Sequence, residues 1–472
     1  MTELHHLTAL QQAEAVRHRE VSPRELAAHY LERIGRLGAE FGAFVTVTAD
    51  RALEAAAEAE ARVLAGEALP PLFGVPTAIK DLNLTAGVAT KFGSAAMADF
   101  VSPVDDHVVT LLRAAGLVSL GKTNTPEFGL PCYTEPDVAP PARTPFDPSR
   151  SAGGSSGGAG AAVAAGLVPV AQGSDGAGSI RIPASVCGVV GLKTSRGRVS
   201  GGPVFADIAG LAVNGPLART VADAAALLDA MASPMPGDPY WAPPLPAGDT
   251  FLAATRLPPG RLRIGRYLTP PIPGAVVDPD CVAAYEGASR LLEALGHTVE
   301  DCDPPFAEDM VATFETIWSV GAASLPVPEE RESELRPLTR WLRERGRAVS
   351  GIQAIEALAT AQLVARQAVV AASAYDAVLT PTLAQVPALV GGLRDDAHPD
   401  ADFDAQKRFT PFTAAANITG QPAISLPLHW TAEGLPVGVQ LAGRPAGEAS
   451  LLALAAQIEA ARPWDAHVPA CW

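Results

Sequence analysis

Two glycine-rich runs, each followed by an apolar stretch, constrain the fold of this chain more than any other feature. Residues 153–158 are Gly-Gly-Ser-Ser-Gly-Gly, and residues 173–179 are Gly-Ser-Asp-Gly-Ala-Gly-Ser. Such runs are usually flexible turns or linkers, but the residues that follow them are largely apolar. Both runs therefore lead into buried elements, where glycine allows the backbone to approach a ligand closely. We expect two loops that carry Ser155 and Ser179 into one site.

A lysine completes this candidate site. Lys80 ends the apolar stretch 73–79, which predicts a buried strand with an amine at its end. Burial lowers the pKa of a lysine, and the neutral amine is a general base. No histidine lies in or near the three segments, so a serine nucleophile would be activated by a lysine and a second serine. The set predicts a hydrolase that acts on amides.

Three segments in chain order resemble the amidase signature family. They are residues 153–158, 173–184 and 187–193, and the spacing of Lys80, Ser155 and Ser179 also agrees with that family. The resemblance extends along most of the chain and is poor only at about 235–370. It implies an amide hydrolase that acts on non-peptide carbon–nitrogen bonds.

The resemblance implies a role for each site residue. Ser179 is the nucleophile, Ser155 follows a cis peptide bond and relays the proton, and neutral Lys80 accepts that proton. The backbone amides of the oxyanion hole are those of Gly176, Ala177 and Gly178. The residues that brace the loop are Ser156, Asp175 and Arg181.

Position 177 departs from the family pattern, because alanine stands where glycine is usual. If the backbone there had a positive φ, alanine would cost roughly 1 kcal/mol. We expect a negative φ instead, with the Cβ of Ala177 narrowing the pocket.

Three other functions compete with this interpretation. Residues 116–123 match a phosphate-binding loop, but Gly116 follows a predicted helix and strand-like residues follow it. Residues 154–158 match the Gly-x-Ser-x-Gly nucleophile elbow, but a polar loop with prolines precedes them where a strand is needed. The third function, that of an inactive binding or scaffold homologue, conflicts with the intact triad.

The pattern of predicted elements indicates an α/β fold. Ser22 at the N-cap, Pro23 at N1 and Glu25 at N3 predict a helix start. Further helices are predicted at 106–115, 220–231 and 280–295, and strands at 261–268 and 375–380. We expect a three-layer α/β/α arrangement with a large mixed, mainly parallel central sheet.

The chain shows no linker long enough to separate domains. We expect a single compact domain over residues 1–472, with the core motifs at 74–203 and a variable insertion at about 235–370.

The composition limits the kinds of partner that this protein is expected to bind. A net charge of −16 argues against nucleic acid, and the apolar runs are shorter than the ~18 residues of a membrane span. Five scattered cysteines and the lack of a signal peptide indicate a reduced cytoplasm. We expect no cofactor and no metal, with the His5–His6 pair on the surface. The oligomeric state stays open, and a homodimer is one option.

Within the family, the chief alternative is the A subunit of a tRNA-dependent glutamine amidotransferase, which supplies ammonia to a partner. Residues 314–324 lack the tyrosine-rich stretch of that type, and Ile182 stands where it tends to have glutamine. Residues 134–136, 175–176 and 195–203 resemble amidases that include cyclic-amide and 6-aminohexanoate oligomer hydrolases.

We therefore expect a free-standing amidase for a small to medium, mostly apolar carboxamide. The residues expected at the pocket wall are Cys132, Tyr133 and Trp318. Cys132 has no basic neighbour in the sequence that would lower its pKa, so we expect it to line the pocket rather than to act as a nucleophile.

Overall fold

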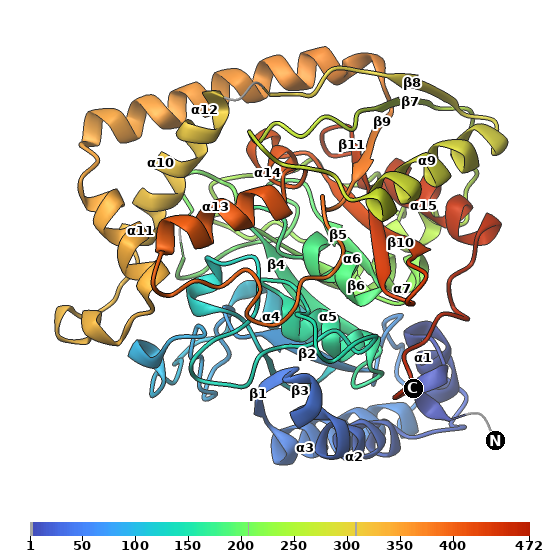
Figure 1. The fold of residues 1–472 in the computed structure, drawn as a ribbon. Coiled ribbons are helices and arrows are strands. Elements are labelled where there is room, and N and C mark those ends of the chain that lie inside the picture. Colours follow the sequence, from blue (N-terminus) through green and yellow to red (C-terminus); the bar gives the residue numbers. More distant parts are fainter. Residues whose placement is uncertain (1–2, 206, 307–308) are drawn as a thin grey trace.

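A mixed sheet of eight strands lies between two layers of helices in the computed structural model, which describes residues 3–205, 207–306 and 309–472 (Figure 1). The strand order is β4-β6-β5-β10-β11-β9-β7-β8. The bounds are Val170–Asp175 (β4), Val190–Lys193 (β5), Val213–Ala218 (β6), Arg263–Arg266 (β7), Thr298–Asp301 (β8), Ala377–Pro381 (β9), Ala423–Trp430 (β10) and Pro436–Gly443 (β11). The expected three-layer α/β/α fold with a large mixed sheet is confirmed.

The expectation of a mainly parallel sheet is wrong in its detail. Five neighbouring pairs in this sheet run antiparallel, and only β7 with β8 and β7 with β9 run parallel. Helix α6 (Arg181–Cys187) connects β4 to β5 as in a parallel unit, but β6 lies between these two strands and runs against both. Alternation of strands and helices along the chain could not reveal that β6 lies between β4 and β5 in the sheet.

Alternating side chains send the two faces of the sheet into different cores. Val170 and Ala218 pack in the cluster that includes α7 (Val221–Met231), α9 (Pro279–Ala294) and α15 (Glu448–Ala461). Their chain neighbours Ala171 and Leu217 pack in the cluster that includes α5 (Gly157–Ala164) and α6. Successive side chains of a strand point to opposite faces, so each helical layer covers one face.

A smaller sheet in the order β1-β3-β2 adjoins the large one. Its strands are Phe44–Val47 (β1), Pro76–Lys80 (β2) and Val118–Thr123 (β3). Strand β2 is buried along its whole length, as its apolar sequence predicts. It lies against β4, where the Thr77 hydroxyl donates to the carbonyl of Val170 at 3.1 Å. This contact brings the ends of β2 and β4, with Lys80 and Asp175, to the same place.

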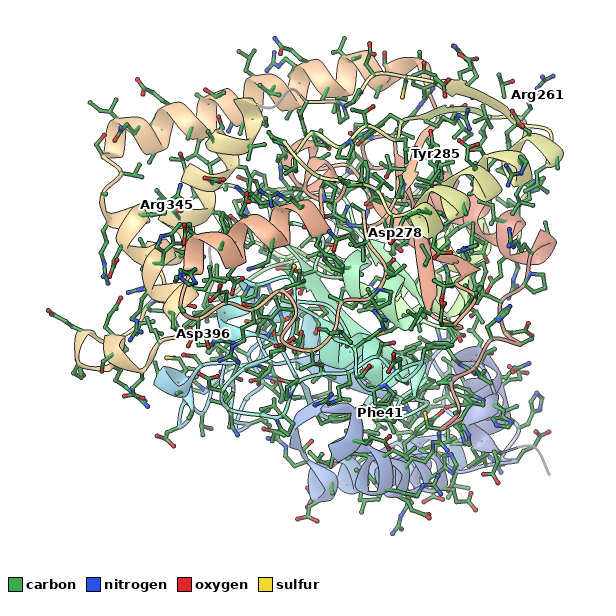
Figure 2. The ribbon with its side chains drawn as sticks, in the orientation of Figure 1. Phe41, Arg261, Asp278, Tyr285, Arg345 and Asp396 are labelled. Atoms are coloured by element: carbon green, nitrogen blue, oxygen red, sulfur yellow. The ribbon has the colours of Figure 1, made fainter. Side chains whose placement is uncertain are left out.

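Local sequence signals predicted several elements well. Helix α2 (Pro23–Phe41) begins with a capping box in which Ser22 and Glu25 bond each other's backbone amides. The predicted helices at 106–115, 220–231 and 280–295 are α4 (His107–Ala114), α7 and α9, and the predicted strands are β7 and β9. The carboxylate of Asp278, labelled in Figure 2, caps α9 by accepting from the amide of Asp280. The remaining long N-terminal helices are Ala9–Arg17 (α1) and Ala49–Leu64 (α3).

The second half of the insertion is helical and lies at the edge of the molecule (Figure 1). Its helices are Asp309–Ala323 (α10), Pro337–Arg347 (α11) and Gly351–Ala371 (α12). Two helices C-terminal to the insertion pack against it: Pro399–Phe409 (α13) lies against α11, and Ala414–Thr419 (α14) lies against α12.

Helix α12 meets the length and composition of a membrane span although its uninterrupted apolar runs are shorter than ~18 residues. Among the described residues, the segment Gly351–Ala374 is long and apolar enough by length and composition, with a mean hydropathy of 1.2 and only 6% of its window buried. Glu356 and Arg366 interrupt its apolar runs in the sequence, but they are the only charged residues of α12. One helix of this kind is weak evidence for a span.

Candidate active site

Lys80 and Ser155 meet in a buried hydrogen bond. The Lys80 amine donates to Ser155 Oγ at 2.8 Å and to the carbonyl of Ser174 at 3.1 Å. The peptide bond between Gly154 and Ser155 is cis, as the resemblance implies. Burial lowers the pKa of Lys80 to about 7, although the charge of Asp175 opposes this shift. A large fraction of Lys80 is therefore neutral near pH 7 and able to accept a proton from Ser155.

Gln172 holds the strand end that carries Lys80. Its side-chain oxygen accepts from the backbone amide of Lys80 at 2.9 Å. Its amide nitrogen donates to the side-chain oxygens of Asn83 and Asn214, each at 2.9 Å. Our sequence reasoning assigned Gln172 no role, although a glutamine inside the apolar strand Val170–Asp175 is a signal that could have found it.

The loop that carries Ser179 donates two backbone hydrogen bonds to the carboxylate of Asp175, at the end of β4. The two oxygens of Asp175 accept from the backbone amides of Gly178 at 2.7 Å and Ile180 at 3.1 Å. Gly178 has a φ of 134°, and a Cβ at this residue would lie 2.5 Å from the Thr413 hydroxyl. The carboxylate of Asp175 thus holds the amides on both sides of Ser179 in place. Residue 178 has to be glycine, because a Cβ there would clash with Thr413.

Asp175 is itself held by Arg181, and both side chains are fully buried. Arg181 donates to the two carboxylate oxygens at 2.9 and 3.0 Å. Its remaining bonds reach the side chains of Gln440 at 2.6 Å and Asn417 at 2.7 Å and the carbonyl of Thr413 at 2.7 Å. Burial alone would raise the pKa of Asp175, but the guanidinium lowers it well below its usual range. Asp175 stays ionised, as a carboxylate that accepts from several N–H groups must.

Asn417 is a second residue without a role in the sequence interpretation. Its amide nitrogen donates to the carbonyl and to the carboxylate of Asp175, each at 2.9 Å, and to the carbonyl of Leu211 at 3.0 Å. Asn417 lies in a C-terminal segment that also resembles the family. The sequence therefore contained a signal for this residue, but the resemblance alone did not give it a role.

The oxyanion hole expected at three amides needs one correction. The Gly178 amide is already bonded to Asp175, so it is not free to bind a substrate oxygen. The amides of Gly176 and Ala177 have no acceptor among the described residues. The described non-glycine residues with positive φ are Arg19, Phe92, Phe128 and Ala446. Ala177 therefore has the expected negative φ, and its side chain causes no backbone strain.

Ser156 joins the two glycine-rich loops. Its hydroxyl donates to the carbonyl of Ser174 at 3.0 Å, and its amide donates to the carbonyl of Ser179 at 3.0 Å. The side chains of Ser155 and Ser179 make no hydrogen bond to each other within the described ranges. Such bonds are often long before substrate binds.

A cavity of about 110 Å³ adjoins Ser179, and its wall is mostly apolar. The motif region contributes Ala177, Ser179, Ile182 and residues 130–132. The insertion contributes Pro271, Ile272, Phe306, Met310, Val311, Phe314 and Trp318. The C-terminal region contributes Phe403, Gln406, Lys407, Thr410, Pro411, Ala414, Ala415 and Ile418. Of the three residues expected at the wall, Cys132 and Trp318 are present.

Tyr133, the third residue expected at the wall, does not line this cavity. Its buried hydroxyl donates to the carboxylate of Asp402 at 2.6 Å. Burial raises the pKa of the Cys132 thiol well above its usual value. The thiol therefore stays protonated, in agreement with a lining role.

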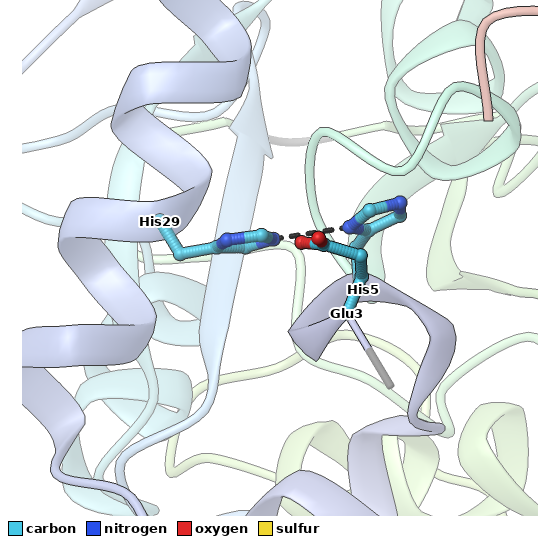
Figure 3. A group of neighbouring side chains, drawn as sticks. All are labelled: Glu3, His5 and His29. Atoms are coloured by element: carbon cyan, nitrogen blue, oxygen red, sulfur yellow. Dashed lines mark hydrogen bonds between the residues drawn. The ribbon is translucent and has the colours of Figure 1, made fainter. Parts of the chain in front are cut away.

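A separate group of possible metal ligands lies near the N-terminus (Figure 3). Glu3, His5 and His29 bring one ligand atom each within 4.8 Å of one another. His5 is buried, contrary to the expectation that it lies on the surface. Burial and the nearby charges of Arg33 and Arg219 lower the pKa of His5 to about 3. The same cations disfavour a bound dication, so the 3.1 Å contact between His5 Nδ1 and His29 Nε2 is best described as a histidine–histidine hydrogen bond.

The chain is similar to known amidases over almost its whole length. The family described as Amidase matches residues 25–452. A putative amidase of Synechocystis sp. is 40% identical over 468 residues, which are 97% of this chain and 89% of the relative. The 6-aminohexanoate-cyclic-dimer hydrolase of Paenarthrobacter ureafaciens is 37% identical over 492 residues, with 98% and 96% covered. The solved structure of a 6-aminohexanoate cyclic dimer hydrolase complexed with substrate is similar with a TM-score of 0.90 and 35% identity over 100% of both chains.

Proposed function

Because the chain belongs to the amidase signature family and is an amide hydrolase, we propose that it hydrolyses a small to medium, mostly apolar carboxamide through an acyl-enzyme on Ser179. The observation that carries the proposal is the 2.8 Å bond from the Lys80 amine to Ser155 Oγ, next to the loop of Ser179. A lysine that is partly neutral at pH 7 supplies the base that the absent histidine would otherwise provide.

Acylation begins with proton transfer along the three side chains. Ser179 Oγ attacks the amide carbon as its proton moves to Ser155 Oγ, and the Ser155 proton moves to the Lys80 amine. The carbonyl π electrons become an oxyanion, which the free amides of Gly176 and Ala177 stabilise. Removing one such donor typically costs about 3–4 kcal/mol of transition-state stabilisation.

The second half of the reaction returns the proton. The C–N bond breaks, the Lys80 proton passes through Ser155 to the leaving nitrogen, and the amine departs. Water then attacks the ester of Ser179 by the same route, which releases the carboxylic acid and restores the serine.

The cavity supports the proposed substrate class. Its lining is mainly aliphatic and aromatic, and Lys407, a cationic side chain of this wall, is bonded to Glu315 at 2.7 Å. A neutral, largely apolar acyl or amine group fits such a wall better than a charged one. One relative is named for the cyclic dimer of 6-aminohexanoate, so cyclic or linear ω-amino-acid amides fall within the proposed class.

The proposal covers the whole chain as one cytoplasmic domain that acts without a partner. Support for one domain comes from the cavity, which draws residues from the motif region, the insertion and the C-terminal region. The five free cysteines fit a reduced compartment. The alternative, an amidotransferase subunit that supplies ammonia to a partner, would hydrolyse glutamine in preference to apolar amides.

The test is product release by the purified chain alone. Primary, anilide, cyclic and ω-amino-acid amides and glutamine are compared by amine or ammonia release, with Ser179→Ala as the control. Activity on apolar amides that Ser179→Ala abolishes, together with a covalent adduct on Ser179 detected by mass spectrometry, is the expected result.

Three results would overturn the proposal. Preference for glutamine would favour the amidotransferase function, and inactivity toward every amide would favour a scaffold. Activity that survives in Ser179→Ala would show that Ser179 is not the nucleophile.

A further inference from the structure

A second cavity, of about 690 Å³, is lined by the large sheet and by helix α12. Its floor is formed by Val378 and Thr380 of β9, which pair with Ala442 and Gln440 of β11. Alternate residues of a strand share one face of a sheet, so the floor is a single face of these two strands. The residues that α12 contributes to the wall are Val364, Gln367, Ala368 and Ala371.

This cavity is distinct from the one at Ser179. The two share only Phe306 and Ala415 among the described residues, and no member of the triad lines the second. Volumes of about 300–1,000 Å³ are typical of small-molecule sites, whereas a packed interior contains few voids larger than a water molecule. Small side chains leave this space open, and the alanines of the wall are Ala368, Ala371, Ala372, Ala415, Ala416 and Ala442.

The charges of this cavity are negative. Asp301 and Asp303 are the only charged residues of its described lining, and because both are exposed they lie where the cavity meets solvent. Asp301 is paired with Arg266 at 2.8 Å. Asp303 has no ion pair or side-chain hydrogen bond within the described ranges. A carboxylate at the mouth of a cavity attracts a cation, and the net charge of −16 adds to this attraction.

A buried hydroxyl of the lining also lacks a partner. Tyr267 is only 7% exposed, and its ring packs against Phe412 with centroids 6.2 Å apart. Its hydroxyl makes no hydrogen bond within the part of the chain that the structure describes. A buried tyrosine hydroxyl usually finds a partner, so a ligand in the cavity is the group that would supply one.

These features select one kind of ligand. An ammonium group has three donors and no acceptor, which suits the carboxylate of Asp303 and the oxygen of Tyr267. The aromatic rings of the wall attract a cation through their faces, and the alanines offer apolar surface to an alkyl chain. We propose that this cavity binds a primary alkylammonium ion. The amines that the proposed reaction releases belong to this class, but the binding site does not depend on that reaction.

Calorimetric titration of the wild type with hexylammonium tests the proposal. The matched probes are 1-hexanol, which is neutral, and hexanoate, which is anionic. We expect hexylammonium to bind with a Kd on the order of 1 mM or below, and both matched probes to bind at least about tenfold more weakly.

Two pairs of variants locate the bound ion. Ala442→Leu fills the floor and should abolish binding, whereas Ala359→Leu, at an exposed alanine of α12 outside the cavity, should leave it unchanged. Asp303→Asn should weaken binding by about three- to tenfold, and Asp249→Asn, which removes the same charge at an exposed aspartate elsewhere, should not. Tyr267→Phe should also weaken binding by about three- to tenfold. Melting temperatures show that each variant is folded.

Several results would overturn the proposal. They are a wild type that does not bind hexylammonium, equal affinity for 1-hexanol, and equal affinities of Asp303→Asn and Asp249→Asn. Binding that persists in Ala442→Leu but is lost in Trp318→Ala would place the amine in the cavity at Ser179 instead. If Ala442→Leu does not fold, the two aspartate variants decide. No substrate is turned over in these measurements, so their outcome is independent of the proposed function.

Discussion

The motif region and the insertion differ in how many of their ion pairs are exposed to solvent. In the motif region, charged side chains are fully buried and extensively hydrogen-bonded, as Lys80, Asp175 and Arg181 are. In the insertion, most ion pairs are partly exposed, as those of Arg266 are, although the guanidinium groups of Arg336 and Arg343 are buried. Apolar side chains of the insertion line the cavity on one side and face solvent on the other. The motif region thus holds the buried charges of the site, whereas the insertion supplies part of the apolar cavity wall.

The largest expected effect concerns the base. Lys80→Ala removes the proton acceptor, so kcat should fall by on the order of 10²–10⁴-fold while KM changes little. Steady-state kinetics on the best apolar amide checks this. Near-normal turnover in a folded Lys80→Ala protein would show that another group activates the serine.

The next effect contrasts two ion pairs. Arg181→Met leaves the buried Asp175 uncompensated and should lower the free energy of unfolding by about 3–5 kcal/mol. The matched change in the insertion, Arg266→Met, breaks partly exposed pairs with Glu286 and Asp301 and should cost about 1 kcal/mol or less. Urea unfolding of both variants measures the difference, and equal losses would contradict the contrast between the regions.

A smaller effect follows from the protonation of Lys80. Only the neutral amine accepts a proton, and burial lowers the pKa of Lys80 to about 7. The value of kcat/KM should therefore rise about tenfold per pH unit below pH 7 and level off above it. A pH profile with an uncharged substrate tests this, and a flat profile between pH 5 and 7 would rule out a titrating base.

The smallest effect concerns the wall that the insertion supplies. Trp318 stacks on Phe314 with ring centroids 5.4 Å apart and lines the cavity. Trp318→Ala should lower kcat/KM for bulky apolar amides by about tenfold and spare the smallest ones. Trp241→Ala, at an exposed tryptophan of the same insertion, is the control, and equal effects of the two changes would remove Trp318 from substrate contact.

Local signals explain which parts of the fold and site could be predicted. The capping box at Ser22 and the burial of β2 depend on residues close in sequence, and both were predicted correctly. The association of Lys80 with Ser155 was predicted because the spacing of glycine-rich loops and a strand-end lysine resembles a known signature. The bond between their side chains bears out that they are neighbours.

Long-range contacts explain the errors. Tyr133 was expected at the wall, but its partner Asp402 lies 269 residues away in sequence. The error at Gly178 is local instead: its amide was expected in the oxyanion hole, but it donates to the carboxylate of Asp175, three residues earlier in the chain. Helix α12 is apolar on both sides, so its sequence cannot tell which side faces the protein.

The network around Arg181 has a consequence for biosynthesis. Its partners Thr413, Asn417 and Gln440 are 232, 236 and 259 residues further along the chain. A ribosome makes the nucleophile loop long before it makes the residues that hold that loop in place. The nascent chain therefore carries the serine and the lysine without an ordered active site, and amide cleavage begins only when the C-terminal part of the protein has emerged and folded.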